Sequence, residues 1–358
     1  MGRGDAGGLS PGDAGERCVT CSGHAEAALR RDVAETRSML VFSLEPDEPL
    51  GRALADALDV PLSPLEERAF LDGERKLRPL VDPRGADAYV VQSLHGGPVE
   101  SPHDKICRLL MFIATLKDHG AARVTAVIPY LAYARKDRQT KPFDPLGLRC
   151  LAQWLESAGM AQLIVLEVHN VAAFQNAFRC PFIHLSVHHV FRHLAEEIAG
   201  GGSPIAVASP DPGGVKRALL WREALEEHLR EPVRFAMIDK RRSAGILSGG
   251  ELVAGEVAGT NVLLLDDLVA SGETLLRGAR ALRLSGAKSV TAFAAHGLFV
   301  GNAPQTLADD AISRLVVSDS MTPFRLPEQG PSREKLRVVS AVPLFAEAVR
   351  ASHVGWHR

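Results

Sequence analysis

The sequence is poor in cysteine, in aromatic residues and in net charge. It has 5 cysteines and 5% aromatic residues in 358 residues, and 41 lysines and arginines nearly balance 43 aspartates and glutamates. So few cysteines, in odd number, exclude the disulfide framework of a small secreted domain and indicate a reducing compartment. A net charge of −2 gives no global positive field, so a nucleic-acid-binding module is a poor fit.

Long apolar runs are also missing. No stretch of about 18 consecutive apolar residues occurs, and no apolar segment follows a basic start, so the sequence predicts neither a membrane span nor a secretory signal. We therefore expect a cytoplasmic protein with no membrane partner. The content of 46% hydrophobic and 23% charged residues is that of a soluble globular chain.

Short strand-like segments alternate with amphipathic helical ones from residue 39 onward. The predicted strands are Met39–Ser43, Ala86–Ser93, Arg123–Pro129, Gln162–Val168, Ile205–Ala208, Val233–Ile238, Asn261–Leu265 and Ser289–Ala294. The helices predicted between and beside them are Glu48–Val60, Lys105–Leu116, Leu146–Ala158, Val215–Leu229 and Gly272–Leu284. This alternation predicts an α/β fold of two units, each a mainly parallel sheet flanked by helices.

We place the two units at residues 39–185 and 186–358. The glycine-rich segment 1–38 has no run that could bury an apolar face, so we expect a disordered tail there. A last amphipathic helix is predicted within Val339–Arg358, packing on either unit. Its expected apolar face consists of Val342, Leu344, Phe345 and Val349.

The segment 261–274, NVLLLDDLVASGET, carries the clearest functional signal. An apolar strand ends in Asp266 and Asp267, and a short Ser-Gly turn then opens a helix. Ligands of open α/β sheets bind at the carboxyl ends of strands, and helix N-terminal amides bind phosphate. The segment therefore predicts a sugar-phosphate site, with phosphate on the amides of residues 271–274 and ribose hydroxyls on the aspartates. Taken singly, Ser271 could be a plain helix N-cap. The sequence has no GxxxxGK[ST] motif, which excludes a P-loop kinase.

This segment resembles the phosphoribosyl-diphosphate (PRPP) loop of type I phosphoribosyltransferases. Five more segments, in the same order, resemble the ribose-phosphate diphosphokinase (PRPP synthetase) family: FLDGE at 70–74, VIPYLAYARKDR at 127–138, SPDPGG at 209–214, DKRR at 239–242 and GNA at 301–303. The resemblance covers about two thirds of the chain. It implies two phosphoribosyltransferase-like domains and transfer of the β,γ-diphosphoryl group of MgATP to the C1 hydroxyl of ribose 5-phosphate, giving PRPP and AMP.

The resemblance also implies roles for the matching residues. The implied ATP-binding residues are Phe70, Asp72, Gly73, Glu74, Arg135 and Lys136. The implied ribose 5-phosphate-binding residues are Arg242, Asp266, Asp267, Ala270, Ser271, Gly272, Glu273 and Thr274. The implied catalytic residues are Lys240 and Arg242, and the implied ligands of Mg²⁺ or its water shell are His169 and Asp211. In the family the loop 70–74 reaches across from a neighbouring subunit, which implies a homo-oligomer built from dimers, up to a hexamer. The basic residues at 240–242 lead into a glycine-bearing stretch, 243–260, that we expect to be a mobile catalytic loop.

Several positions depart from the family pattern. Ala270 and Glu273 replace the usual loop residues, Lys136 replaces a glutamine, and Glu167 replaces an aspartate two residues before His169. Glu273 puts a carboxylate near a phosphate that it would repel, so we expect its side chain to point away. The segment 139–147 also differs, so nucleotide regulation is not predicted.

Three alternatives stay open on the sequence alone. They are a catalytically silent relative that regulates true synthetases, a phosphoribosyltransferase that joins a base to PRPP, and a diphosphokinase or kinase with a different acceptor or donor. We assign no catalytic role to Cys107, Cys150 or Cys180, which fall in or beside apolar runs. Cys18, Cys21 and His24 have the spacing of half a zinc site, but no second pair of ligands stands nearby, so no zinc site is predicted.

Overall fold

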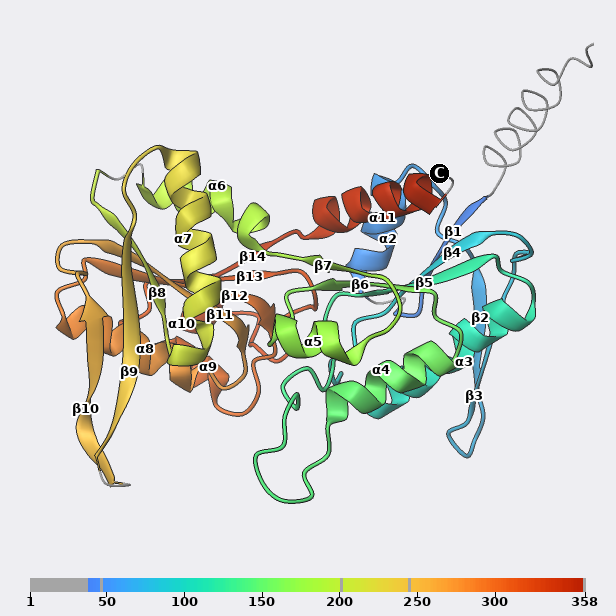
Figure 1. Ribbon diagram of the computed structural model, residues 1–358, viewed down its shortest axis with the longest axis horizontal. Coiled ribbons are helices and arrows are strands. Elements are labelled where there is room, and N and C mark those ends of the chain that lie inside the picture. Colours follow the sequence, from blue (N-terminus) through green and yellow to red (C-terminus); the bar gives the residue numbers. More distant parts are fainter. Residues whose placement is uncertain (1–37, 46–47, 200–201, 244–245, 357–358) are drawn as a thin grey trace, which may run out of the picture.

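The computed structural model describes residues 38–45, 48–199, 202–243 and 246–356. Two sheets lie side by side along the longest axis of the molecule, each covered by helices on both faces (Figure 1). The predicted α/β architecture of two mainly parallel sheets is confirmed. The predicted tail, apart from Ser38, lies outside the described residues.

The first sheet has five strands, all parallel. In spatial order they are β1 (Met39–Ser43), β4 (Asp87–Val91), β5 (Arg123–Ile128), β6 (Gln162–Leu166) and β7 (Phe182–Leu185). Strands β4 and β5 are buried at every residue, as expected for parallel strands covered on both faces. The helices α3 (Pro102–Asp118), α4 (Gly147–Ser157) and α5 (Val171–Ala177) cover one face, and α2 (Pro49–Ala57) and α11 (Val342–Trp356) cover the other (Figure 1).

The second sheet has seven strands, parallel except at one edge. In spatial order they are β10 (Ile246–Gly255), β9 (Arg234–Ser243), β8 (Ile205–Ser209), β11 (Asn261–Val269), β12 (Ser289–Gly297), β13 (Arg314–Ser318) and β14 (Leu336–Val339). The helices α6 (His188–Ala199) and α7 (Val215–Leu229) pack on one face, and α8 (Glu273–Leu284) and α9 (Ala303–Leu307) pack on the other. The short elements η1 (Pro212–Gly214) and α10 (Pro331–Glu334) complete this half.

The expectation of a loop without regular structure over 243–260 is wrong for residues 246–255. The mobility and catalytic role expected of this stretch stay predictions. Residues Ile246–Gly255 form β10, which pairs antiparallel with β9 around an irregularity between Leu247 and Glu251. The ladder with β9 satisfies the backbone of this glycine-bearing stretch without the continuous apolar run that signals a core strand. The sequence reading therefore missed it, as it missed β7, β13 and β14.

The last helix, α11, packs on the first sheet, although the chain enters it from the second. Three of its predicted apolar residues, Val342, Phe345 and Val349, are buried, and Leu344 is partly buried. Polar contacts fix its end: Arg123 Nη2 donates to Ser352 O at 3.2 Å, and His353 Nδ1 lies 2.7 Å from Asp87 Oδ2. One cluster of buried apolar side chains runs from α2 and α11 to α6 and α7, so the two halves share a core on this face.

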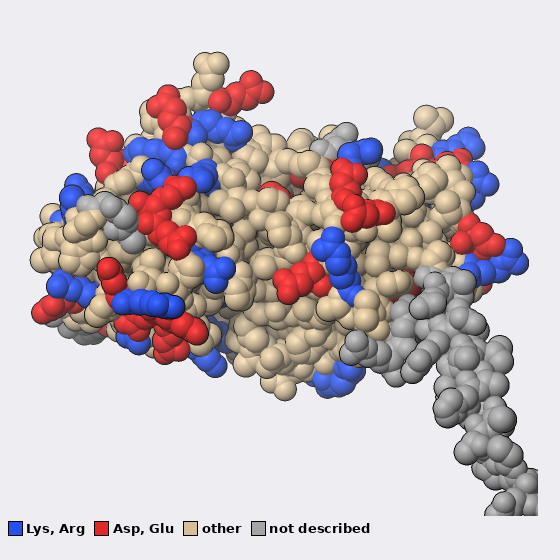
Figure 2. All heavy atoms as spheres, turned by 90° about the horizontal axis from the view of Figure 1, so that it is seen from above, with Lys and Arg blue, Asp and Glu red and all other residues tan. Residues whose placement is uncertain are grey.

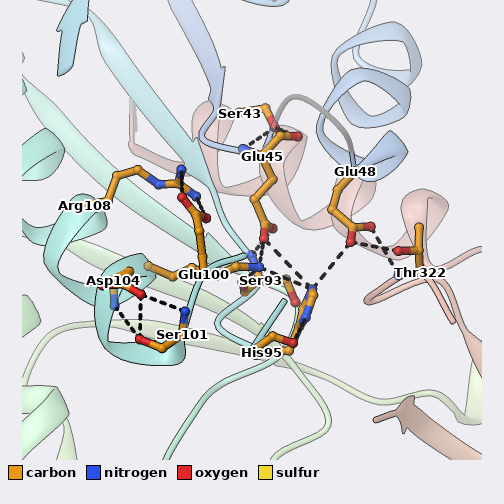
Figure 3. A network of polar contacts seen from close by, with 12 residues as sticks. Ser43, Glu45, Glu48, Ser93, His95, Glu100, Ser101, Asp104, Arg108 and Thr322 are labelled. Carbon is orange, nitrogen blue, oxygen red and sulfur yellow. Dashed lines mark hydrogen bonds and ion pairs between the residues drawn. The ribbon is translucent and has the colours of Figure 1, made fainter. Parts of the chain in front are cut away.

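Polar contacts also join the two halves near the carboxyl ends of β1 and β4 (Figure 3). The Glu45 carboxylate accepts from Ser93 N at 2.8 Å and pairs with the buried Lys105. Glu48 lies 3.6 Å from His95 and accepts from Thr322 Oγ1 at 3.0 Å. Burial alone would raise the pKa of Glu48, but the bonds from His95 and Thr322 hold it below its usual value. Glu48 therefore fastens the first half to the segment after β13.

A two-stranded hairpin stands apart from both sheets. It pairs β2 (Leu65–Ala69) with β3 (Arg75–Pro79), and residues 70–74 form its tip. Elsewhere on the surface, acidic and basic side chains are interspersed over both halves of the face seen from above (Figure 2). None of the helices in the described residues combines the length and apolar character that crossing a bilayer needs.

Candidate active site

A hollow opens at the carboxyl ends of strands from both sheets. It is lined by Arg135, which follows β5, by His169, which follows β6, by Asp211, which follows β8, and by residues 266–275 at the end of β11 and the start of α8. Parallel strands bring residues that are far apart in the chain to one edge of a sheet. Ligands of open α/β sheets bind at this edge, where the strands have their carboxyl ends, and we call this the strand-end rule. Three of the predicted ATP or metal residues, Arg135, His169 and Asp211, thus meet the predicted PRPP loop.

The loop before α8 leaves backbone donors for a ligand. Gly272 is the N-cap of α8, with φ of 79°, and no side chain caps the helix. A Cβ at this position would lie 2.9 Å from Leu307 Cδ2, so both the conformation and the space favour glycine. The interpretation of Ser271 as a plain N-cap is therefore wrong. The first amides of α8 have no side-chain acceptor and can bind an anion, with the positive end of the helix dipole behind them.

The two aspartates at the end of β11 have different surroundings. Asp267 is buried, His169 Nδ1 donates to its Oδ2 at 2.7 Å, and Arg217 Nη1 lies 3.9 Å from its Oδ1. Burial alone would raise the pKa of Asp267, but the His169 bond and the Arg217 charge hold it well below its usual value. Burial and the charge of Asp267 raise the pKa of Asp266 well above its usual value. Asp267 is thus committed to His169 and Arg217, which leaves Asp266 as the member of the pair available to a sugar hydroxyl.

His169 faces the hollow from the first sheet. Its ring is 44% exposed, and its hydrogen bond to Asp267 raises its pKa against the opposing effect of burial. With Nδ1 on Asp267, the other ring nitrogen, Nε2, is the one left for a ligand. A strand-end histidine with one nitrogen held by a carboxylate is oriented for binding.

Asp211 begins the turn that leads into α7. Its Oδ1 accepts from Gly213 N at 2.9 Å and from Gly214 N at 3.1 Å, so it caps η1. Asp211 therefore has the turn-forming role that its place before Pro-Gly-Gly allows. Its second oxygen, Oδ2, makes no hydrogen bond to the described residues, and Asp211 lines the hollow.

The donor set suits a metal ion that arrives on a substrate. The described parts of the chain hold no group of three or more His, Cys, Asp or Glu side chains placed to bind a metal ion. Mg²⁺ keeps several waters and is commonly held by one or two protein groups together with substrate phosphates. One histidine and one carboxylate beside the predicted phosphate-binding loop fit that arrangement.

Other predicted residues lie elsewhere. Phe70, Asp72, Gly73 and Glu74 belong to the tip of the β2–β3 hairpin and do not line this hollow. In Figure 1 the hairpin lies at the end of the first half that is far from the second sheet. Lys136 Nζ lies 2.5 Å from Asp144 Oδ2, and Lys136 does not line the hollow. The backbone of Lys240 and Arg242 belongs to β9, next to β8, but their side chains fall outside what the structure describes.

Two residues that the sequence reading missed support the hollow from behind. Arg217 and His296 both contact the turn at Glu167: Arg217 Nε donates to Glu167 Oε1 at 3.0 Å, and His296 Nε2 donates to Glu167 O at 2.9 Å. His296 stands at the carboxyl end of β12, so the strand-end rule could have found it. Arg217 lies three residues after Gly214 and therefore on the same side of α7 as the turn that Asp211 begins. Nothing in the sequence indicates which residues it contacts.

Comparisons with known proteins agree with this geometry. Residues 39–159 match the family described as the N-terminal domain of ribose phosphate pyrophosphokinase, and residues 250–356 match the phosphoribosyl synthetase-associated domain. A ribose-phosphate pyrophosphokinase of Clostridium tetani is 32% identical over 319 residues, which are 89% of this chain and 95% of that protein. Ribose-phosphate pyrophosphokinase 2 of Enterococcus faecalis is 36% identical over 313 residues, 87% of this chain and 92% of that protein.

A solved structure points the same way. The phosphoribosylpyrophosphate synthetase of Mycobacterium smegmatis superposes with a TM-score of 0.77 at 30% identity, over 89% of this chain and all of that one. Relatives of this identity and coverage confirm the resemblance drawn from the six sequence segments. The chain belongs to the ribose-phosphate pyrophosphokinase family.

Proposed function

We propose that this chain makes PRPP and AMP from ATP and ribose 5-phosphate. The observation that carries the proposal is the hollow itself. There the uncapped N-terminus of α8, beside the second sheet, faces Arg135 and His169 from the first sheet. A phosphoribosyltransferase would explain the loop before α8 but not the groups that face it from the first sheet. The family membership supports the diphosphokinase over the alternatives that the sequence left open.

Ribose 5-phosphate would bind along the second sheet. Its phosphate would accept from the amides of residues 271–274, where the dipole of α8 favours negative charge. Its ring hydroxyls would bond to Asp266, because Asp267 already holds His169 and Arg217. Ala270 and Thr274 complete the lining, and Glu273 is exposed at the first position of α8. We keep the prediction that the Glu273 carboxylate points away from the phosphate.

ATP would bind from the side of the first sheet. Arg135 is exposed in the hollow, where its guanidinium can pair with triphosphate oxygens. The C1 oxygen of ribose 5-phosphate then forms a bond to the β-phosphorus, the bond from that phosphorus to the oxygen shared with the α-phosphorus breaks, and AMP leaves. The C1 hydroxyl releases its proton to solvent in the same process, which balances the step. Catalysis of this transfer consists mainly of positioning and of neutralising oxygen charge.

We assign that neutralisation to Lys240 and Arg242. Both stand on β9, which is separated from β11 only by β8. Mg²⁺ bound to ATP would spread the charge on the phosphate oxygens. His169 and Asp211 would hold the ion or its waters, the first through the ring nitrogen that Asp267 leaves free and the second through Oδ2.

We also propose that the active unit is a homo-oligomer built from dimers, up to a hexamer. The tip of the β2–β3 hairpin carries Phe70, Asp72, Gly73 and Glu74 away from its own hollow, and Phe70 is 42% exposed with the Arg68 guanidinium 5.2 Å from its ring. A hairpin of that shape can place these residues in the adenine pocket of a neighbouring subunit. We further propose that the enzyme is cytoplasmic and that its domains are residues 39–185 and 186–358. We assign Lys136 to ATP binding at the edge of the hollow, on the side of the first sheet.

The test is an incubation of the purified protein with ATP, Mg²⁺ and ribose 5-phosphate, followed by ³¹P NMR. AMP and PRPP in equal amounts are expected, and neither should form when ribose 5-phosphate is omitted. ADP instead of AMP would show transfer of one phosphoryl group and would overturn the proposal. Absence of turnover would favour a silent regulatory relative or a different acceptor.

A further inference from the structure

We infer that Arg217 is a positioning residue, which holds the turn at residues 167–169 of the first sheet against Asp267 of the second. The inference deepens the proposed function, because it concerns how the ATP half and the ribose half of the hollow are kept in register. Arg217 lies in the first turn of α7, and its side chain is 13% exposed. It borders the hollow's residues without lining the hollow itself.

The guanidinium of Arg217 makes contacts in three directions. Its Nε donates to Glu167 Oε1 at 3.0 Å, and its Nη2 donates to Val168 O at 3.4 Å and to His169 O at 3.1 Å. Its Nη1 lies 3.9 Å from Asp267 Oδ1. One planar cation thus touches a carboxylate and two carbonyls at the end of β6 and also faces the carboxylate that receives His169.

The segment that Arg217 holds has an unusual backbone. Glu167 has φ of 35°, a left-handed conformation that a non-glycine residue adopts at a cost. Several partners fix it: His296 Nε2 donates to its carbonyl at 2.9 Å, and its Oε2 accepts from Val187 N at 3.2 Å. Two of the groups that hold this turn, Arg217 and His296, come from the second sheet or its helices. The bend directs His169 toward Asp267 across the boundary between the two halves, which we call the seam.

A lysine could not replace this arrangement. Its ammonium is a point charge on a flexible stem, whereas the fork of arginine reaches several acceptors in fixed directions. Arg217→Lys keeps the charge near Asp267 and Glu167 but loses at least one of the carbonyl contacts. We therefore expect the turn to loosen while the fold and the PRPP loop stay intact.

The test compares Arg217→Lys with two matched variants. Arg222→Gln changes an arginine on the same helix whose Nε lies 3.7 Å from Glu226 Oε2. Glu48→Gln weakens a different contact across the seam between the halves. Hydrogen exchange of the peptide covering residues 167–174 should become at least about threefold faster in Arg217→Lys and stay unchanged in the other two. This readout needs no activity, so it separates a failure of the inference from a failure of the proposed function.

Kinetics add a second readout. In Arg217→Lys, kcat for PRPP formation should fall about tenfold or more, with the Kd of ribose 5-phosphate changed less than about threefold. In a His169→Ala background Arg217→Lys should lower kcat little further, because the two residues act as one unit. Equal effects from Glu48→Gln would show that loosening the seam in general is responsible. Unchanged exchange at residues 167–174, or full additivity with His169→Ala, would overturn the inference.

Discussion

His169 and Asp267 lie 2.7 Å apart, ring Nδ1 to carboxylate Oδ2, although they belong to different sheets and are separated by 98 residues in the chain. This bond joins the carboxyl end of β6 to that of β11. It fixes which ring nitrogen of His169 faces the hollow, and with Arg217 it keeps Asp267 charged. The two halves of the site, to which we assign ATP and ribose 5-phosphate, are therefore in direct contact through this side-chain pair.

Asp267→Asn tests that connection. The amide keeps the shape of the side chain but removes the charge that orients the imidazole, so we expect kcat to fall about tenfold to a hundredfold. The KM for ribose 5-phosphate should change much less, because Asp266 and the loop amides remain. Initial rates of AMP formation measure both constants, and Asp82→Asn, at an exposed site, serves as the control. An unaltered kcat would show that the pair has no part in turnover.

Gly272→Ala tests the loop before α8. A Cβ at φ of 79° is strained and meets Leu307 at 2.9 Å, so the loop must shift. A left-handed residue other than glycine costs about 1–2 kcal/mol, which corresponds to about a tenfold rise in KM for ribose 5-phosphate if the loop yields instead of the fold.

The matched control is Gly278→Ala on the same helix. There a Cβ would find its nearest neighbour, Leu264 Cδ2, at an ordinary 3.5 Å, and alanine favours a helix interior. We expect an unchanged KM and an equal or higher melting temperature. Equal KM values for both variants would mean that the ligand phosphate does not depend on the geometry of this loop.

The sequence predicts the fold and half of the site because both depend on local patterns. Alternating strands and helices mark the parallel sheets, and a strand that ends in Asp266 and Asp267 before a Ser-Gly turn marks a phosphate loop. Arg217 was missed because its partners lie about 50 residues earlier, on a turn whose left-handed backbone at Glu167 leaves no trace in composition. The β10 strand was missed because pairing with β9 stabilises it, and a run rich in glycine gives no strand pattern by itself.

Arg123→Gln tests how α11 is held. Arg123 Nη2 lies 2.6 Å from Asp87 Oδ2, with both side chains buried, and it also reaches the carbonyl of Ser352 on α11. Without Arg123 the buried Asp87 carboxylate keeps only contacts such as those from Tyr89 and His353, and the loss of one partner of a buried ion pair is strongly destabilising. We therefore expect the free energy of unfolding to fall by about 3 kcal/mol. The control is Arg84→Gln, which breaks an exposed pair with Asp82 and should scarcely change the melting temperature. Thermal melting of both variants makes the comparison. A similar loss in both would contradict the importance of burial at Arg123.

The cysteines should differ in reactivity. Burial, together with the nearby charge of Glu156, raises the pKa of Cys180 to about 12, whereas Cys107 is exposed. Because the thiolate is the reactive form, only about one Cys180 in ten thousand is reactive at pH 8. Iodoacetamide followed by peptide mass spectrometry should label Cys107 and leave Cys180 unmodified, and both should react alike in urea. Labelling of Cys180 in the folded protein at the rate of Cys107 would show that its environment is open.

Lys240→Ala tests the assignment of transition-state charge. Lys240 stands on β9, paired in the backbone ladder with Glu251 of β10 and two strands from the aspartates of β11. If its ammonium meets charge that develops only during transfer, its loss should lower kcat about a hundredfold and leave the KM values for ATP and ribose 5-phosphate nearly unchanged. Lys288→Ala, at an exposed lysine that bonds to Ser203, should behave as the wild type. A rise in the KM for ATP at constant kcat would instead place Lys240 among the groups that bind the ground state, and the charge assignment would then pass to Arg242 alone.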